Sequence, residues 1–202
     1  SEKIVQLEKL RVDQLETQLK LLKMQYHPHF LFNALNTIYF LIDEENEEAI
    51  EAVELLSDLL RYQLYDINTK VTIEEEIDYL RTYIQFQRLR MTKRLQFEES
   101  FDPELTGQKI HPLLSQPFLE NAFKYIGGAY RIQVSMRKEG AKVCLGVSNT
   151  FNPDFLEQRK GKGIGIDNLR KRLELLYPDK HELRIKKDNT RFRVELCIDL
   201  SE

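Results

Sequence analysis

The feature that most constrains the fold is a long apolar seam at the start of the chain. Leucine, methionine and isoleucine recur every three or four residues between positions 7 and 42, with polar Gln14 and Thr17 as interruptions. A sustained seam of this period predicts a helix that packs lengthwise against other helices, as in a coiled coil or bundle. Pro28 lies inside the seam and removes one backbone hydrogen bond, so a kink or hinge is predicted there.

Two further helices are predicted before residue 92. Three acidic residues at 43–45 suit the first turn of a second helix. Its predicted apolar face consists of Ile50, Val53, Leu56 and Leu60. Thr72 followed by Glu75 is a capping-box pattern, which predicts the start of a third helix.

The pattern changes near Arg94, where short strand-like runs replace the helical periodicity. The predicted strands are 94–101, 131–137, 142–149, 182–187 and 191–199, and the predicted helices are 112–126 and 166–177. Strands mixed with two helices favour an α/β sandwich over a parallel βαβ series. The chain is therefore predicted to be α+β, with a helical region at 1–92 and a sandwich domain at 93–202. Between its strands, the polar, glycine-ended segment 150–165 is predicted to be a mobile loop.

Charge, hydropathy and cysteine content narrow the possible partners and the expected chemistry of the chain. A net charge of −3 over 202 residues gives no electrostatic reason to expect binding to nucleic acid or to an anionic membrane. No segment has the roughly 18 apolar residues of a membrane span, and the start at Ser1 rather than Met suggests an excised fragment. Cys144 and Cys197 lie in separate apolar runs without a CxxC motif, so we expect two buried free thiols.

A histidine follows the proline of the first helix. His29, Asn33 and Asn36 are spaced four and three residues apart, which places them on one helical stripe. A neutral imidazole with a pKa of about 6.5 is a competent nucleophile at neutral pH. The pattern alone also fits a surface histidine beside a kink, and less well a metal site formed with His27, because no third ligand is nearby.

The predicted helix at 112–126 has a polar edge formed by Glu120, Asn121 and Lys124. A carboxylate, an amide oxygen and an ammonium together suit Mg²⁺ and the phosphates of a nucleotide. An ordinary amphipathic helix explains the same residues equally well when they are taken alone.

Two weaker signals follow along the chain. Gly161, Gly163 and Gly165 precede a predicted helix, where backbone N–H groups bind anions and glycine allows phosphate to approach closely. Asn149 ends a predicted strand, where its side-chain carbonyl can accept a hydrogen bond from an adenine amino group. A flexible loop and a simple turn residue are the respective alternatives.

Together these elements resemble the LytS-like branch of sensor histidine kinases. The phosphoacceptor signature PHFLFN is present at 28–33, and the N-box motif QPxxENAxK is present at 116–124. The glycine motif GxGIG begins at Gly161 and continues through Asn168 to Arg172 and Leu173. The resemblance covers the chain from about Lys20 to its end.

The resemblance implies a helical dimerisation and phosphotransfer region joined to a GHKL-type ATP-binding sandwich. It implies that His29 is phosphorylated by ATP, with Asn33 and Glu120 as further catalytic residues and Asn121 as the Mg²⁺ ligand. The implied ATP-binding residues are Asn121, Lys124, Asn149, Gly161, Gly163, Gly165 and Asn168. Within this set the glycines form a lid, and Asn168 begins the helix beneath the nucleotide.

The chain departs from the family pattern at two positions. Tyr125 stands where the family commonly has histidine, and Asn149 stands where the superfamily has an adenine-reading aspartate. Asn149 leaves open a pseudokinase or scaffold in a signalling dimer. A GHKL ATPase that does not phosphorylate histidine is a second alternative, against which the His29 motif argues.

The resemblance also implies partners and a cellular location. The implied partners are a second copy of the chain and a response regulator of the LytTR type, with no direct contact to nucleic acid. The implied location is the cytoplasm, with the parent protein anchored in the inner or plasma membrane by segments outside this chain.

Overall fold

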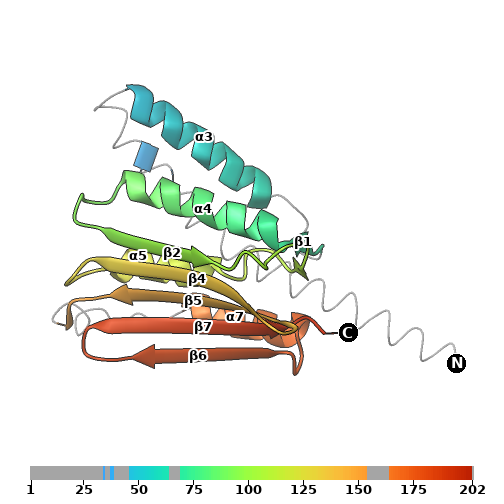
Figure 1. The fold of residues 1–202 in the computed structure, drawn as a ribbon. Helices are drawn as coiled ribbons and strands as arrows, with labels where there is room; N and C mark the ends of the chain where they lie inside the picture. Colours follow the sequence, from blue (N-terminus) through green and yellow to red (C-terminus); the bar gives the residue numbers. More distant parts are fainter. Residues whose placement is uncertain (1–33, 35–36, 39–45, 64–68, 154–163, 202) are drawn as a thin grey trace, which may run out of the picture.

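The computed structural model describes residues 34, 37–38, 46–63, 69–153 and 164–201. In these residues the chain forms helices packed on a mixed sheet, so the predicted α+β class is confirmed (Figure 1). Ala34, Thr37 and Ile38 are helical, but most of the predicted first helix, including Pro28, lies outside the described residues. No helix in the described part of the chain is long and apolar enough to cross a membrane.

Helix α3 (Asn46–Gln63) differs in one respect from its prediction. Its buried stripe consists of Ala52, Leu56, Leu59 and Gln63, spaced four, three and four residues apart. Val53 was expected on the buried face, but its side chain is 51% exposed. One residue corresponds to about 100° of helical rotation, so Val53 turns away from the stripe that begins at Ala52.

Helix α4 (Ile73–Leu89) begins as predicted with a capping box. The Thr72 N–H donates to Glu75 Oε2 at 2.7 Å, and the Glu75 N–H donates to Thr72 Oγ1 at 3.3 Å. Two backbone donors that the helix cannot satisfy are thus bonded at its first turn. Helix α4 lies between α3 and the edge of the sheet, and nine of its residues are buried (Figure 1).

The main sheet has five strands. In their order across the sheet they are β2 (Gln96–Phe101), β4 (Arg131–Glu139), β5 (Lys142–Thr150), β7 (Arg191–Asp199) and β6 (His181–Lys187). Strands β2 and β4 are parallel, and the other neighbours are antiparallel. All five predicted strands are therefore confirmed. A small two-stranded sheet of β1 (Val71–Thr72) and β3 (Lys109–Ile110) was not predicted.

The two faces of the main sheet differ in composition. One face, here called the covered face, is apolar and packs against α5 (Gln116–Tyr125) and α7 (Ile164–Leu176), which lie behind the sheet in Figure 1. Its central side chains are Ile132, Val134, Met136, Val143, Leu145, Val147, Val194, Leu196 and Ile198. The other face, here called the open face, includes Gln133, Ser135, Arg137, Cys144, Ser148, Glu195 and Cys197.

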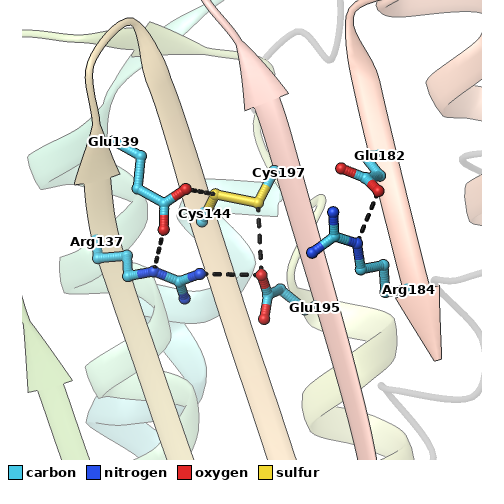
Figure 2. A network of polar contacts seen from close by, with 7 residues as sticks. All are labelled: Arg137, Glu139, Cys144, Glu182, Arg184, Glu195 and Cys197. Carbon is cyan, nitrogen blue, oxygen red and sulfur yellow. Dashed lines mark hydrogen bonds and ion pairs between the residues drawn. A yellow bond between two sulfur atoms is a disulfide. The ribbon is translucent and has the colours of Figure 1, made fainter. Parts of the chain in front are cut away.

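The open face contains a disulfide between Cys144 and Cys197 (Figure 2). The two residues are direct partners in the β5–β7 ladder, with their Cα atoms 4.0 Å apart. The prediction of two free thiols was therefore wrong. The pairing depends on the register of two strands whose cysteines are 53 residues apart in the sequence, and neither apolar run alone reveals that register.

Candidate active site

Helix α5 divides as its sequence predicted. Leu119, Ala122 and Phe123 are at most 3% exposed, whereas Lys124 is exposed. Pro117 lies in the first turn, where the N–H group that proline lacks has no helical partner to lose. The helix thus anchors one side in the core and leaves its polar edge accessible.

The carboxylate of Glu120 on this edge is half-buried. Burial raises the pKa of Glu120 above its ordinary value, while a hydrogen bond from Gln116 and the ammonium of Lys124 act in the opposite direction. The Gln116 Nε2 group donates to Glu120 Oε1 at 2.8 Å. Because the bond spans one turn of the helix, it fixes one oxygen of the carboxylate.

Asn149 lies at the end of β5, on the covered face and 3% exposed. This end of the strand is tied to the loop that follows α5, because Thr150 Oγ1 donates to the Gly127 carbonyl at 2.8 Å and the Gly127 N–H donates to the Thr150 carbonyl at 3.0 Å. A side chain at Gly127 would place its Cβ only 2.9 Å from the Asn152 nitrogen. Glycine at this position therefore permits the close contact between the end of β5 and the loop that follows α5.

Helix α7 corrects one prediction. It begins at Ile164, so Asn168 lies in its second turn and does not begin the helix. Gly165 lies in the first turn, and a Cβ atom built there would be 3.7 Å from Pro117 Cβ in α5. The starts of the two helices that carry the N-box and glycine motifs are therefore neighbours.

Several candidate residues lie outside the described residues. These are His29, Asn33 and Asn36 of the phosphoacceptor run, and Gly161 and Gly163 of the glycine motif. Their predicted roles, and the predicted lid between β5 and α7, stay predictions.

A buried carboxylate that sequence analysis missed holds the start of α5. Glu76 is 1% exposed and accepts hydrogen bonds from the Tyr62 hydroxyl at 2.7 Å, the Ser115 hydroxyl at 2.8 Å and the Leu113 N–H at 3.1 Å. Burial raises its pKa, and these three bonds and the charge of Arg172 oppose the shift. In the sequence, Glu76 follows Glu74 and Glu75 and resembles one more exposed acid of a first helical turn.

The same segment is held from α7. The Arg172 guanidinium donates to the carbonyls of Pro112 at 2.6 Å and Leu113 at 3.4 Å. The Tyr177 hydroxyl contacts both the backbone N–H and the Nδ1 of His111 at 2.9 Å. Burial and the charges of Arg172 and Lys70 lower the pKa of His111 to about 4, so this imidazole is neutral near pH 7. Arg172 belongs to the glycine motif, but its role in fixing this segment could not be predicted.

The open face also has a hollow, but no motif residue lines it. Gly146 makes room for it, because a Cβ atom there would lie 2.8 Å from Ser135 Oγ. Its lining includes Gln133, Ser148, Arg193 and Glu195. The described motif residues are thus on the opposite side of the sheet or on the helices that cover it.

Comparison with known proteins identifies the family. A family profile described as "Histidine kinase" matches residues 17–95. Sensor histidine kinase YesM of Bacillus subtilis (strain 168) is 35% identical over 182 residues, which cover 86% of this chain and 32% of YesM. Sensor histidine kinase BtsS of Escherichia coli (strain K12) is 31% identical over 174 residues, which cover 84% of this chain and 31% of BtsS. The chain belongs to the sensor histidine kinase family.

Membership confirms the resemblance on which the motif assignments rest. This chain spans about a third of the length of the two sensor histidine kinases named above. Among solved structures, the histidine kinase AdeS of Acinetobacter baumannii aligns with 96% of this chain and 98% of its own, at 16% identity and a TM-score of 0.49.

Proposed function

We propose that this chain is the kinase core of a two-component sensor histidine kinase. In this proposal, His29 receives the γ-phosphoryl group of ATP and passes it to an aspartate of a response regulator. The observation that carries the proposal is that α5, whose polar edge contains Glu120, Asn121 and Lys124, packs against β5, the strand that carries Asn149. The family of the chain and the order of its motifs support the same reaction.

The sandwich would bind ATP in the manner of a GHKL-type domain. Asn149 would accept a hydrogen bond from the adenine amino group, and Lys124 would face the phosphates. The side-chain oxygen of Asn121 is a ligand of the type that Mg²⁺ prefers, and it is half-buried on the polar edge of α5. When bound, Mg²⁺ would neutralise part of the negative charge of the phosphates. Gly161, Gly163 and Gly165 would cover the nucleotide, with Asn168 beneath it in the second turn of α7.

The transfer itself is a substitution at phosphorus. The unprotonated ring nitrogen of His29 attacks the γ-phosphorus, the bond to the bridging oxygen breaks, and ADP leaves with that electron pair. Positive charge develops on the imidazole, and the Glu120 carboxylate would stabilise the remaining ring N–H, with Asn33 positioned one turn from His29 to orient the acceptor. Most of the rate enhancement in such reactions comes from positioning and charge neutralisation.

The same proposal includes a homodimer. Among the described residues, Val53 is the large apolar side chain that is exposed, and it lies on α3 away from the stripe that contacts the rest of the chain. A helical bundle formed with a second copy would cover it. Residues 1–92 would then supply dimerisation and phosphotransfer, and residues 93–202 the ATP-binding domain. A LytTR-type regulator and a membrane anchor in segments outside this chain complete the proposal.

The test uses γ-labelled ATP with Mg²⁺ and three proteins, the wild type, His29→Ala and His27→Ala. We expect the wild type and His27→Ala to incorporate a label that is lost in acid and retained in alkali. We expect His29→Ala to incorporate none while still binding ATP. Equal labelling of His29→Ala, or a label that survives acid, would contradict the proposal.

Asn149 favours a second candidate, a signalling scaffold with little or no kinase activity. An amide keeps the acceptor that adenine requires but lacks the charge of the usual aspartate. For a scaffold, we expect neither label nor ADP in the same assay. An ATPase that does not phosphorylate histidine would release ADP without labelling the protein.

A further inference from the structure

A chain of hydrogen bonds runs through the interior from α3 to the carboxylate of Glu120. Gln63 Nε2 donates to Tyr79 Oη at 3.2 Å, and Tyr79 Oη donates to Gln116 Oε1 at 3.1 Å. Gln116 Nε2 then donates to Glu120 Oε1 at 2.8 Å. Gln63, Tyr79 and Gln116 are each 3% exposed, so water does not compete for these bonds.

The direction of the chain follows from the chemistry of its end. The Gln116 NH₂ group faces Glu120, which suits an ionised carboxylate because that form can only accept hydrogen bonds. Its amide oxygen then faces Tyr79, which must donate its hydroxyl proton. Tyr79 is left with acceptor capacity, which the NH₂ group of Gln63 fills. Every donor therefore points toward Glu120, an arrangement in which each bond strengthens the next.

The three elements are joined by packing as well. The ring of Tyr62 on α3 stacks on the ring of Tyr79, with centroids 4.6 Å apart and planes inclined by 19°. Tyr62 also donates to Glu76, which in turn accepts the hydroxyl of Ser115. The last two residues of α3 are thus connected through α4 to the start of α5. A shift of α3 along or around α4 cannot leave these contacts unchanged.

We propose that Tyr79 and Gln116 are positioning residues for Glu120, and that Gln63 makes the orientation of its carboxylate depend on the position of α3. This inference rests on the proposed function where it assigns Glu120 to phosphoryl transfer. Because α3 directly follows the predicted phosphoacceptor region in the sequence, a signal that moves α3 would change the rate of phosphorylation. Nucleotide affinity would stay the same, because Asn121 and Asn149 are outside the chain of bonds.

The competing explanation is that these residues only satisfy one another inside the core. Both explanations predict a loss of stability when a bond is removed. They differ at Glu120, because a purely structural cluster would transmit nothing from Tyr79 or Gln63 to the carboxylate or to the reaction rate.

The first experiment observes the side-chain NH₂ signals of Gln116 by NMR, assigned by their loss in Gln116→Met. We expect Tyr79→Phe to shift these signals and to speed their exchange with water, because the amide loses the bond that orients it. Gln63→Met, located on α3, is expected to shift them in the same direction by a smaller amount. Ser148→Ala is the control, since it removes another buried hydroxyl, one that lies on the open face and donates to Gln133.

The second experiment measures autophosphorylation at saturating ATP together with ATP affinity. We expect Tyr79→Phe and Gln116→Met to slow the reaction about tenfold with ATP affinity unchanged, because only the orientation of Glu120 is lost. Gln63→Met is expected to slow it less, and Ser148→Ala to leave it unchanged. If Tyr79→Phe does not fold, the comparison of Gln63→Met with Ser148→Ala carries the test.

The outcomes separate the two proposals. A wild type that incorporates no label, with Gln116 signals that still respond to Tyr79→Phe and Gln63→Met, would overturn the proposed function and support the coupling. An active wild type whose Gln116 signals and rate do not respond to these two substitutions would overturn the coupling. A parallel loss of rate and ATP affinity in Tyr79→Phe would also overturn it, since that result indicates a structural role.

Discussion

The covered and open faces of the main sheet use polar residues in opposite ways. On the covered side, buried groups such as Glu76 and Arg172 are hydrogen-bonded to the backbone and side chains around the start of α5. On the open face, Arg184 pairs with Glu182 at 2.7 Å, and both side chains are more than half exposed. A buried polar group is costly unless it is bonded, whereas an exposed ion pair contributes little. The buried polar groups whose hydrogen bonds depend on exact geometry therefore lie on the side of the sheet that carries the motif residues.

On the open face, the disulfide is expected to make a large contribution to stability. It closes a segment of 53 residues that includes α7 and the strand end with Asn149. Reduction of the disulfide frees this segment in the unfolded state and so stabilises that state. We therefore expect reduction to lower the free energy of unfolding by about 4 kcal/mol. Urea unfolding of oxidised and reduced protein measures this difference. The Cys144→Ser/Cys197→Ser variant controls for the reductant, and a difference below about 1 kcal/mol would show that the disulfide does not set the stability of this face.

Removal of the buried carboxylate is the next largest expected effect. Glu76→Ala leaves the hydroxyls of Tyr62 and Ser115 and the N–H of Leu113 without their acceptor. We expect a loss of about 3 kcal/mol in unfolding free energy. Asp78→Ala, an exposed acid on the same helix, is the control and should change stability by less than about 0.5 kcal/mol. Similar losses in both variants would remove the distinction between buried and exposed acids.

Burial of His111 on the covered side predicts that the stability of the protein depends on pH. Its pKa is lowered to about 4 by burial, Arg172 and Lys70, whereas an unfolded histidine titrates near 6.5. Between these values the unfolded state binds more protons, so the contribution of His111 to stability falls as pH falls. His111→Asn keeps an acceptor for Tyr177 but does not titrate. The stability of the wild type minus that of His111→Asn should therefore decrease from about pH 7 to about pH 4; a constant difference would contradict this.

The smallest expected loss of stability comes from an exposed arginine, and it can be compared with the loss at a buried arginine after the same substitution. Arg172→Gln removes charged donors from the Pro112 and Leu113 carbonyls inside the protein, and we expect a loss of about 2 kcal/mol. Arg184→Gln breaks only an exposed pair, and we expect no measurable change in the unfolding midpoint. A clear loss in Arg184→Gln would show that the open face is more than a solvated surface.

Local patterns predicted much of this structure. The capping box at Thr72, the five main strands and the division of α5 into a buried and a polar side all depend on residues close together in the sequence. Such patterns act within one turn or one strand, so a single chain is enough to recognise them.

The features that were missed depend on distant pairs. The disulfide requires the register of β5 against β7, and the bond between Tyr79 and Gln116 joins residues 37 positions apart. Val53 was misplaced because the apolar residues of α3 fit more than one stripe until the position of α4 selects one. For the site, the motifs predicted the polar edge of α5, but only the fold shows that Glu76 and Arg172 hold the start of α5 in place.

The most direct test of the difference between the faces uses two neighbouring residues of β5. Asn149 points to the covered face, whereas Ser148 points to the open face and donates to Gln133 at 3.3 Å. Calorimetric titration with an ATP analogue and Mg²⁺ is expected to show about tenfold weaker binding by Asn149→Ala, the loss of one hydrogen bond to adenine. Ser148→Ala is expected to bind as the wild type does. Unchanged affinity in Asn149→Ala, or an equal loss in Ser148→Ala, would contradict the assignment of nucleotide binding to the covered face.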